Sequence, residues 1–239
     1  MKHLKKVFAF GDSILKGAVL EDGPGVKYSL LPKGFLELCK DALGIELNNH
    51  ARFGSTIAAG RKMFDRHISS MQPEDIALLE FGGNDCDFPW ERVGKNPDYP
   101  KVPHTPLSEF SQFYAGIIRD CRERGVIPVM LSLPPLVSRR FYHFVTRNLT
   151  KLEKISVLRW MGNVIEFISH WHIQYNLEIF HLARTLNVPL INLSTPFLVR
   201  PDYSAYICRD GIHPNASGHR LMAEAVLSQW PFERPLVSG

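Results

Sequence analysis

Five short apolar runs recur along the chain, each bounded by Gly, Pro, Asn or Asp. They cover residues 6–10, 45–49, 76–81, 127–133 and 190–193. Short apolar runs between such turn formers are typical of buried strands, because a strand that is covered on both faces has no polar side. The pattern therefore predicts five strands that lie inside the molecule.

Helical patterns lie between these runs. In residues 31–43 and 107–124 apolar side chains recur at helical spacing, and residues 216–230 predict a last helix that covers the end of the sheet. Strands that alternate with helices favour a parallel sheet with helices on both faces. The fold class predicted from this order is α/β, with a five-stranded parallel sheet.

Two segments are longer than ordinary loops, which have about 4–6 residues. Residues 86–106 are polar and proline-rich, and residues 139–176 are basic, aromatic and rich in histidine. The second segment predicts helix with one apolar face, interpreted first as core packing, made of Leu152, Ile155, Leu158, Ile165, Ile168, Trp171 and Tyr175. We expect both segments to be insertions in a single domain, residues 1–239, and not domains of their own.

Composition and charge narrow the classes of partner. Of 239 residues, 45% are hydrophobic and 22% charged, an ordinary globular mixture. The net charge is +4, and Lys and Arg are scattered except for Lys2, Lys5 and Lys6, which favours a solvated surface over a nucleic-acid partner. No apolar run approaches the ~18 residues of a membrane helix, and no signal peptide is recognised, so a cytoplasmic location is expected.

The four cysteines, Cys39, Cys86, Cys121 and Cys208, form no C-x-x-C pair and no zinc-binding spacing with histidine. Reduced thiols and the absence of a metal are therefore expected. Because Cys86 follows a GGND motif and Cys208 precedes a DGIH motif, a redox-sensitive pair of these two is the less favoured alternative.

Short polar motifs follow three of the predicted strands and precede the last helix. The loop after the first strand reads GDS and ends at Ser13, the loop after the second contains Gly54, and the loop after the third reads GGND and contains Asn84. The motif DGIH, which ends at His213, comes just before the last helix. In an open parallel sheet, ligands bind outside the carboxyl ends of the strands, so these motifs are predicted to meet at one edge.

These residues are the types that nucleophilic ester cleavage needs. Ser13 supplies a hydroxyl, His213 a base for its proton, and Asp210, three residues earlier, a carboxylate that orients the imidazole. The backbone N–H groups of Ser13 and Gly54 and the side-chain amide of Asn84 are candidate donors to the oxyanion. Singly, the motifs are more typical of a helix cap, of turns and of a polar surface. Together, at one edge, they favour catalysis.

The same residues carry a resemblance to a known family. GDS, Gly54, GGND and DGIHP resemble the four sequence blocks of the SGNH, or GDSL, esterase and lipase family, and they span nearly the whole chain. The resemblance implies a flavodoxin-like three-layer α/β/α sandwich with strand order 2-1-3-4-5. It also implies Ser13 as nucleophile, His213 as base, Asp210 as its acid, and an oxyanion hole of Ser13, Gly54 and Asn84. Such a mechanism requires no metal or organic cofactor.

Two other functions are alternatives to ester hydrolysis. An acyltransferase, in which a second alcohol replaces water, needs the same residues. A non-catalytic flavodoxin-like binding module predicts a glycine-rich phosphate loop after the first strand, which residues 11–17 lack, and Asp12 would repel the anion. We interpret Asp12 instead as a residue that fixes its loop by accepting hydrogen bonds from backbone amides.

The expected substrate is a small-molecule ester of a short acyl group, above all acetyl, with a polar alcohol such as a sugar. Phe88, Trp90 and Asp12 are candidates for the wall of the site, and Tyr99 and His104 lie in the same segment as the two aromatic residues. Aromatic faces with polar edges suit a sugar ring, whereas a long acyl chain needs an aliphatic groove. The aromatic side chains equally fit a role in attaching the loop to the body. An apolar groove from residues 139–176 would favour a lipase or lysophospholipase.

Overall fold

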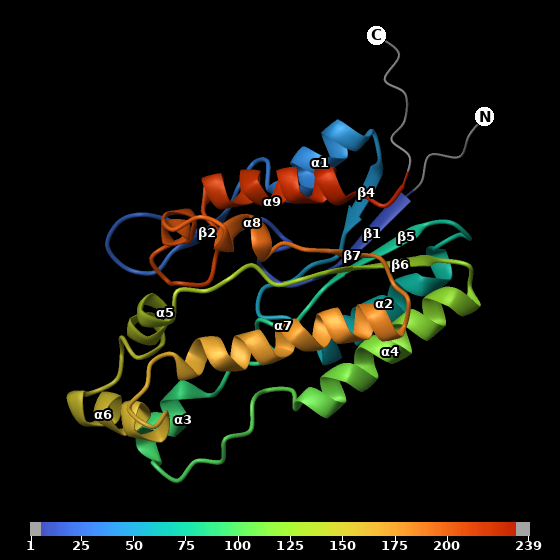
Figure 1. Ribbon diagram of the computed structural model, residues 1–239. Coiled ribbons are helices and arrows are strands. Elements are labelled where there is room, and N and C mark those ends of the chain that lie inside the picture. The colour runs from blue at the N-terminus through green and yellow to red at the C-terminus, as the bar shows by residue number, and fades with distance from the viewer. Residues whose placement is uncertain (1–5, 233–239) are drawn as a thin grey trace.

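The sheet has five parallel strands in the order β4-β1-β5-β6-β7 in the computed structural model, which describes residues 6–232 (Figure 1). The strands are β1 (Lys6–Gly11), β4 (Glu46–Asn49), β5 (Ile76–Glu80), β6 (Ile127–Leu131) and β7 (Leu190–Ile191). Numbered among themselves along the chain, they stand in the order 2-1-3-4-5. Helices cover both faces, so the predicted fold class, a flavodoxin-like three-layer α/β/α sandwich, is confirmed.

Two helix layers lie on opposite sides of this sheet (Figure 1). One layer contains α2 (Ile57–His67), α4 (Leu107–Glu123) and α7 (Phe167–Thr185), and the other contains α1 (Phe35–Leu43) and α9 (Ala216–Gln229). In β1, Phe8 and Phe10 pack in the core under the first layer, while Val7 and Ala9 pack under the second. Because successive side chains of a strand point to opposite faces, burial of both faces explains the unbroken apolar runs.

A two-stranded antiparallel hairpin, which the sequence analysis did not predict, lies between β1 and α1. Its strands are β2 (Ala18–Leu20) and β3 (Tyr28–Leu30). Each strand has three residues, too few for an alternating pattern to be recognised. The helix predicted over 31–43 begins only at Phe35, because a turn that contains Pro32 separates it from β3.

The two long segments meet in a second helical cluster. They form α3 (Trp90–Lys95), α5 (Ser138–Val145), α6 (Lys151–Trp160) and the start of α7. Figure 1 shows α3, α5 and α6 together, at the side of the molecule away from both chain ends. Their apolar side chains form a core of their own, separate from the two cores of the sheet. We call this cluster the aromatic cap (residues 88–99 and 136–171).

The single apolar face predicted for residues 139–176 is wrong at two positions. Leu152 is 78% exposed and Ile155 is 39% exposed, while Ile168 and Tyr175 are buried. The chain turns sharply between α6 and α7, where Gly162 and Asn163 have positive φ angles of 75° and 61°. Residues before and after this turn belong to separate helices, so one helical periodicity does not describe both.

Three short elements complete the chain: η1 (Ile68–Ser70), α8 (Thr195–Leu198) and η2 (Tyr203–Tyr206). The strands predicted over 127–133 and 190–193 each end two residues earlier, at Leu131 and Ile191. Their last apolar residues leave the sheet but stay buried, as Leu133 and Leu193 do.

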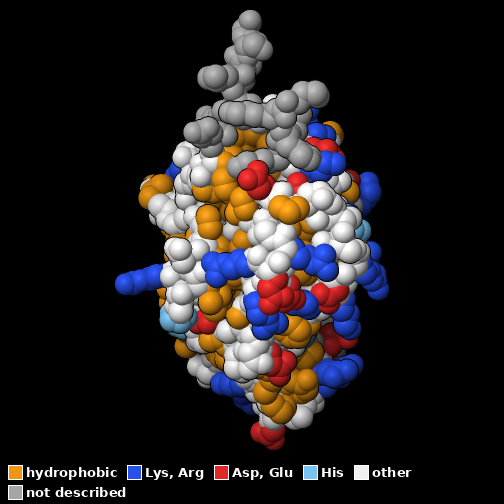
Figure 2. All heavy atoms as spheres, turned by 90° about the vertical axis from the view of Figure 1, so that its right-hand side faces the viewer, with side chains coloured by type: hydrophobic (Ala, Val, Ile, Leu, Met, Phe, Trp, Pro, Cys, Tyr) orange, Lys and Arg blue, Asp and Glu red, His pale blue; other side chains and the backbone are white. Residues whose placement is uncertain are grey.

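The end of the molecule at which β1 begins carries mixed charge. Figure 2 views this end, and Lys and Arg side chains there are interspersed with Asp, Glu and hydrophobic side chains. Within residues 6–232, no helix is both long enough and apolar enough to cross a membrane. All four cysteines are buried, and none of them forms a disulfide in this structure.

Candidate active site

Ser13 lies in a tight turn directly after β1. At the end of the strand, a side chain on Gly11 would place its Cβ 2.6 Å from the Glu80 carbonyl oxygen, so only glycine allows the chain to leave the sheet here. The Ala18 N–H then donates to the Ser13 carbonyl at 2.9 Å. The chain continues into β2 and not into a helix, so the helix-cap interpretation of GDS is wrong.

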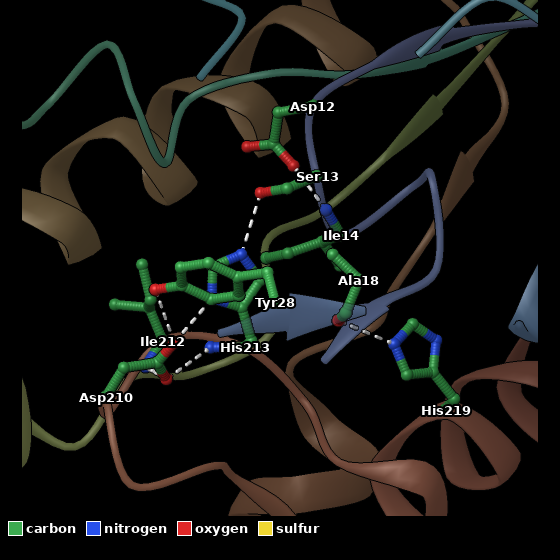
Figure 3. Close-up of polar contacts among 9 residues, drawn as sticks. All are labelled: Asp12, Ser13, Ile14, Ala18, Tyr28, Asp210, Ile212, His213 and His219. Carbon is green, nitrogen blue, oxygen red and sulfur yellow. Dashed lines mark hydrogen bonds and ion pairs between the residues drawn. The ribbon is translucent and has the colours of Figure 1, made fainter. Parts of the chain in front are cut away.

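Ser13, His213 and Asp210 are arranged as a Ser-His-Asp triad (Figure 3). Ser13 Oγ lies 2.8 Å from His213 Nε2, and His213 Nδ1 lies 2.7 Å from Asp210 Oδ2. A carboxylate only accepts hydrogen bonds, so Nδ1 carries the proton, and Nε2 is left to accept from the serine hydroxyl. The base is therefore held in the tautomer that can take the Ser13 proton.

Asp210 is held in place by its own turn. Its Oδ1 accepts the backbone N–H groups of Ile212 and His213, both at 3.1 Å. Burial alone would raise the pKa of Asp210, but the hydrogen bonds from the His213 ring and from these two amides outweigh it and lower the pKa. Asp210 is therefore a carboxylate at neutral pH, as the orienting member of a triad must be.

Tyr28, from the hairpin, is a site residue that the sequence analysis missed. Its hydroxyl donates to Asp210 Oδ2 at 3.1 Å, and its ring centroid lies 4.9 Å from that of His213 (Figure 3). Burial, and then the nearby Asp210 carboxylate, raises the pKa of Tyr28, so the hydroxyl keeps its proton and remains a donor. No motif surrounds Tyr28 in the sequence, and only the packing of the hairpin over the triad reveals it.

The candidate oxyanion donors face the same cavity. Ser13, Gly54 and Asn84 all line the cavity beside His213. Among the described residues, no hydrogen-bond acceptor is found for the backbone N–H of Ser13 or of Gly54. Gly54 has a φ angle of 67°, which an L side chain rarely adopts. Both amides are thus free to bind a substrate oxygen.

Asp12 orients the side chain of Asn84. Asp12 Oδ2 accepts from Asn84 Nδ2 at 2.9 Å, and Asp12 Oδ1 accepts from the Ile14 N–H at 2.8 Å. An amide oxygen would be repelled by a carboxylate, so the amide nitrogen of Asn84 must face Asp12. The second N–H of Asn84 then remains for another acceptor. The bond to Ile14 matches the expected loop-fixing role of Asp12.

Asp85 joins the two loops that carry Gly54 and Asn84. It is fully buried, and its two oxygens accept the N–H of Ile57 at 2.9 and 3.2 Å. Ile57 is the first residue of α2, where free N–H groups and the helix dipole favour a nearby carboxylate. Burial nevertheless raises the pKa of Asp85 to about 6.

The cavity beside Ser13 has a volume of about 260 Å³, and its lining is mainly apolar. The aromatic cap contributes Phe88, Trp90, Leu136, Phe141, Ile168 and Trp171. All three predicted wall residues, Asp12, Phe88 and Trp90, line it. Tyr99 and His104 do not: the Tyr99 carbonyl accepts from Trp160 Nε1 at 2.6 Å, and His104 Nδ1 lies 3.1 Å from the Asn84 carbonyl.

His172 also lines the cavity, and the sequence analysis did not single it out. Burial lowers the pKa of His172 to about 4, so its imidazole is neutral at neutral pH. Its ring nitrogens have no hydrogen-bond partner in residues 6–232. No group of three or more His, Cys, Asp or Glu side chains in that part of the chain is arranged to hold a metal ion.

Comparison with known proteins identifies the family. The model of the GDSL-like lipase/acylhydrolase family matches residues 9–221, which is most of the chain. This chain therefore belongs to that family, and the predicted class of enzyme, a carboxylic ester hydrolase, is confirmed. No significant match was found among curated proteins.

Solved structures share the fold at low sequence identity. An acetylxylan esterase from Geobacillus stearothermophilus has a TM-score of 0.65 and 18% identity, over 98% of this chain and 98% of that chain. A lipase/acylhydrolase from Enterococcus faecalis has a TM-score of 0.60 and 16% identity, over 98% of this chain and 100% of that chain. A member of the lipolytic G-D-S-L family from Veillonella parvula has a TM-score of 0.61 and 16% identity, over 94% and 97%.

Proposed function

We propose that this protein hydrolyses carboxylic esters through an acyl-enzyme on Ser13. The observation that carries the proposal is the hydrogen-bonded chain from Ser13 Oγ to His213 Nε2, at 2.8 Å, and from His213 Nδ1 to Asp210, at 2.7 Å. The free N–H groups of Ser13 and Gly54 beside these three side chains also support the proposal, because acyl transfer needs hydrogen-bond donors at the oxyanion.

The reaction then follows in two halves. Ser13 Oγ attacks the ester carbonyl carbon while His213 Nε2 takes the hydroxyl proton, and the carbonyl oxygen becomes an oxyanion among the three donors. As the oxyanion re-forms the carbonyl, the C–O bond to the alcohol breaks, and His213 gives its proton to the leaving alcohol oxygen. Water then attacks the acyl-enzyme in the same way and releases the acid.

The rate should depend on pH through His213. Since His213 acts as a base only when its imidazole is neutral, activity should rise as the pH increases from acidic values.

The lining of the cavity favours an acyl group larger than acetyl. A buried sugar needs partners for several hydroxyls, but two polar groups of the lining are already bonded: Asp87 accepts from Trp90 Nε1 at 2.7 Å, and Cys86 donates to the Gly83 carbonyl at 3.3 Å. Beyond the triad and the oxyanion donors, the imidazole of His172 is the polar group of the lining that has no partner among the described residues. A cavity of 150 Å³ holds the six carbons of benzene, so about 260 Å³ has room for roughly ten such atoms. Because the reacting ester group beside Ser13 takes part of this space, the rest suits an apolar chain of roughly six to eight carbon atoms. We therefore propose a medium-length apolar acyl chain in the cavity.

The mouth of the cavity suits the polar alcohol that the sequence suggested. Phe53 is 49% exposed there, and its ring centroid lies 6.2 Å from that of Tyr28. An exposed aromatic face can stack on a sugar ring whose hydroxyls stay in water. The exposed ring of Phe53 therefore supports a second candidate substrate, an acetyl ester whose sugar binds at the mouth of the cavity.

A serine-reactive fluorophosphonate probe tests the proposed nucleophile. We expect the probe to label the wild-type protein and Ser111→Ala, and not Ser13→Ala. Ser111 is a matched control, because it lies in α4 and its hydroxyl bonds to Leu107 and Glu178, away from the cavity. Labelling of Ser13→Ala at the wild-type level would overturn the proposal.

A series of p-nitrophenyl esters from acetate to decanoate tests the acyl group. We expect kcat/KM to rise to a maximum near six to eight carbons and then to fall, because a longer chain exceeds the cavity. A maximum at acetate would support the acetyl candidate instead. A steady rise to decanoate would favour a lipase-like enzyme with a longer groove.

A further inference from the structure

Glu80 is a buried carboxyl group that the ester mechanism does not use. It is the last residue of β5, and none of its surface is exposed. Its Oε2 accepts only a long hydrogen bond from the Asp12 N–H, at 3.5 Å, and its Oε1 is fully buried without a hydrogen-bond partner. A buried polar oxygen without a hydrogen-bond partner destabilises the folded protein, so its presence calls for an explanation.

The surroundings of Glu80 are acidic. Asp12, from the turn after β1, and Asp85, from the loop after β5, are both buried beside it. From α4, the hydroxyl of Tyr114 accepts the Phe81 N–H at 3.1 Å, one residue after Glu80. Within the described part of the chain, no Lys or Arg forms an ion pair with Asp12, Glu80 or Asp85.

Glu80 is the member of this group that holds a proton. Burial, and then the Asp12 charge, raises the pKa of Glu80 well above its usual value. Burial also raises the pKa of Asp12, but the Ile14 N–H, the positive form of His213 and the Glu80 and Asn84 side chains all favour the carboxylate of Asp12. The side chains of Asp12 and Glu80 lie close enough to form a hydrogen bond, so a proton on Glu80 can be donated to an Asp12 oxygen.

We propose that Glu80 is a positioning residue of the oxyanion hole: its carboxylic acid donates to Asp12, and Asp12 in turn holds the amide of Asn84. The inference rests on the proposed ester hydrolysis. Asp12 accepts from Asn84 Nδ2 at 2.9 Å and so fixes which end of the amide faces the cavity. Without the Glu80 hydrogen, two carboxylates would face each other, or Asp12 would itself take the proton. A protonated Asp12 can donate to the Asn84 oxygen, which would turn the amide over and remove the oxyanion donor.

Two variants of Glu80 and one of Asp12 test the chain of contacts. In Glu80→Gln a neutral amide replaces the carboxylic acid at the same size, and we expect kcat to stay within about twofold of wild type. In Glu80→Ala the donor is lost, and we expect kcat to fall about tenfold with KM nearly unchanged, because the oxyanion donor acts in the transition state. In the Asp12→Asn background, Glu80→Ala should lower kcat no further.

Thermal unfolding between pH 5 and pH 9 tests the proton on Glu80 without any substrate. Because the pKa of Glu80 is raised in the folded protein, wild type loses stability as pH rises from the usual glutamate pKa towards the folded one. Gln has no proton to lose, so the Tm advantage of Glu80→Gln over wild type should grow with pH. Asp75→Asn is the matched control, since Asp75 is a buried carboxyl at the opposite end of β5, 3% exposed, and accepts from the Gln72 N–H.

Three results would overturn the inference: a rise in KM with unchanged kcat in Glu80→Ala, a kcat in Glu80→Gln as low as in Glu80→Ala, or a Tm difference that does not change with pH. Failure of the proposed function looks different, because Ser13→Ala would then keep its activity. The Tm experiment still decides about the Glu80 proton in that case.

Discussion

Two walls of one cavity are built by different means. The catalytic edge (Ser13, Gly54, Asn84, Asp210 and His213) consists of polar groups in short turns that follow strands or precede the last helix, each fixed by hydrogen bonds or left free to donate. The aromatic cap consists of apolar side chains on separate helices, held by ring packing. The edge is equipped for chemistry on any ester, whereas the cap determines the shape of the space that the ester must fill.

The ring of Phe88 illustrates the second kind of wall. It packs edge-on against Trp90, Trp160 and Trp171, with centroids 5.0 to 5.7 Å apart. Each such pair adds about 0.5–1.5 kcal/mol beyond the area that it buries, so these ring contacts stabilise the cap. Changes at the edge should therefore alter kcat for all esters, and changes in the cap should alter the preferred ester.

The largest effect is expected at the nucleophile. Ser13→Ala should lower kcat by about 10⁴–10⁶-fold for every ester, because it removes the hydroxyl that we propose as the nucleophile. The measurement is ester hydrolysis by the purified variant, with circular dichroism to verify its fold. Near-normal hydrolysis by a folded variant would show that Ser13 is not the nucleophile.

The next effect is expected at the oxyanion donor. Asn84→Ala should lower kcat by about 10²–10³-fold and change KM little, because the donor acts on a charge that develops only in the transition state. Steady-state kinetics with one short and one medium ester checks this. If kcat is unchanged and KM rises, Asn84 contacts the bound substrate and, like the cap, affects substrate binding and not the rate of the chemical step.

A smaller loss is expected at Tyr28. Tyr28→Phe removes the hydrogen bond of 3.1 Å to Asp210 and keeps the ring against His213, so kcat should fall about tenfold. Tyr142→Phe is a matched control in the cap, where the hydroxyl donates to the Lys154 carbonyl at 3.1 Å. An equal loss of kcat in both variants would indicate a general effect on packing.

The smallest change of rate, but the sharpest change of preference, is expected in the cap. Trp171→Ala enlarges the cavity, so the best acyl chain should become longer by a few carbons, while acetate hydrolysis stays within about twofold. Trp230→Ala removes the same ring from the far core and should leave the chain-length profile unchanged. An unchanged profile in Trp171→Ala would mean that the cap only supports the fold.

How far the site could be predicted differs between these two walls. Phe88 and Trp90 were identified as candidates, but the apolar lining from Phe141, Ile168 and Trp171 was expected only as an alternative. The sequence of 139–176 shows one apolar periodicity, and the turn at Gly162 separates it into helices with different orientations. Which side chains of the cap reach the cavity depends on the angles between those helices, and no local pattern records them.

The sequence by itself determined the fold class, the family and the meeting of four motifs at one edge of the sheet. Three of the motifs follow strands, and parallel strands bring all their carboxyl ends to the same edge, whatever the length of chain between them. The fourth motif precedes the helix that covers the end of the sheet. Only the tertiary structure placed Tyr28 on Asp210, 182 residues away, and Glu80 beneath Asp12, 68 residues away. The first contact depends on how the β2-β3 hairpin packs over the turn that carries Asp210. The second depends on which residue of β5 lies beside the turn that follows β1. A single buried oxygen or hydroxyl contributes nothing to hydrophobic periodicity, so its role becomes visible only once its neighbours in space are known.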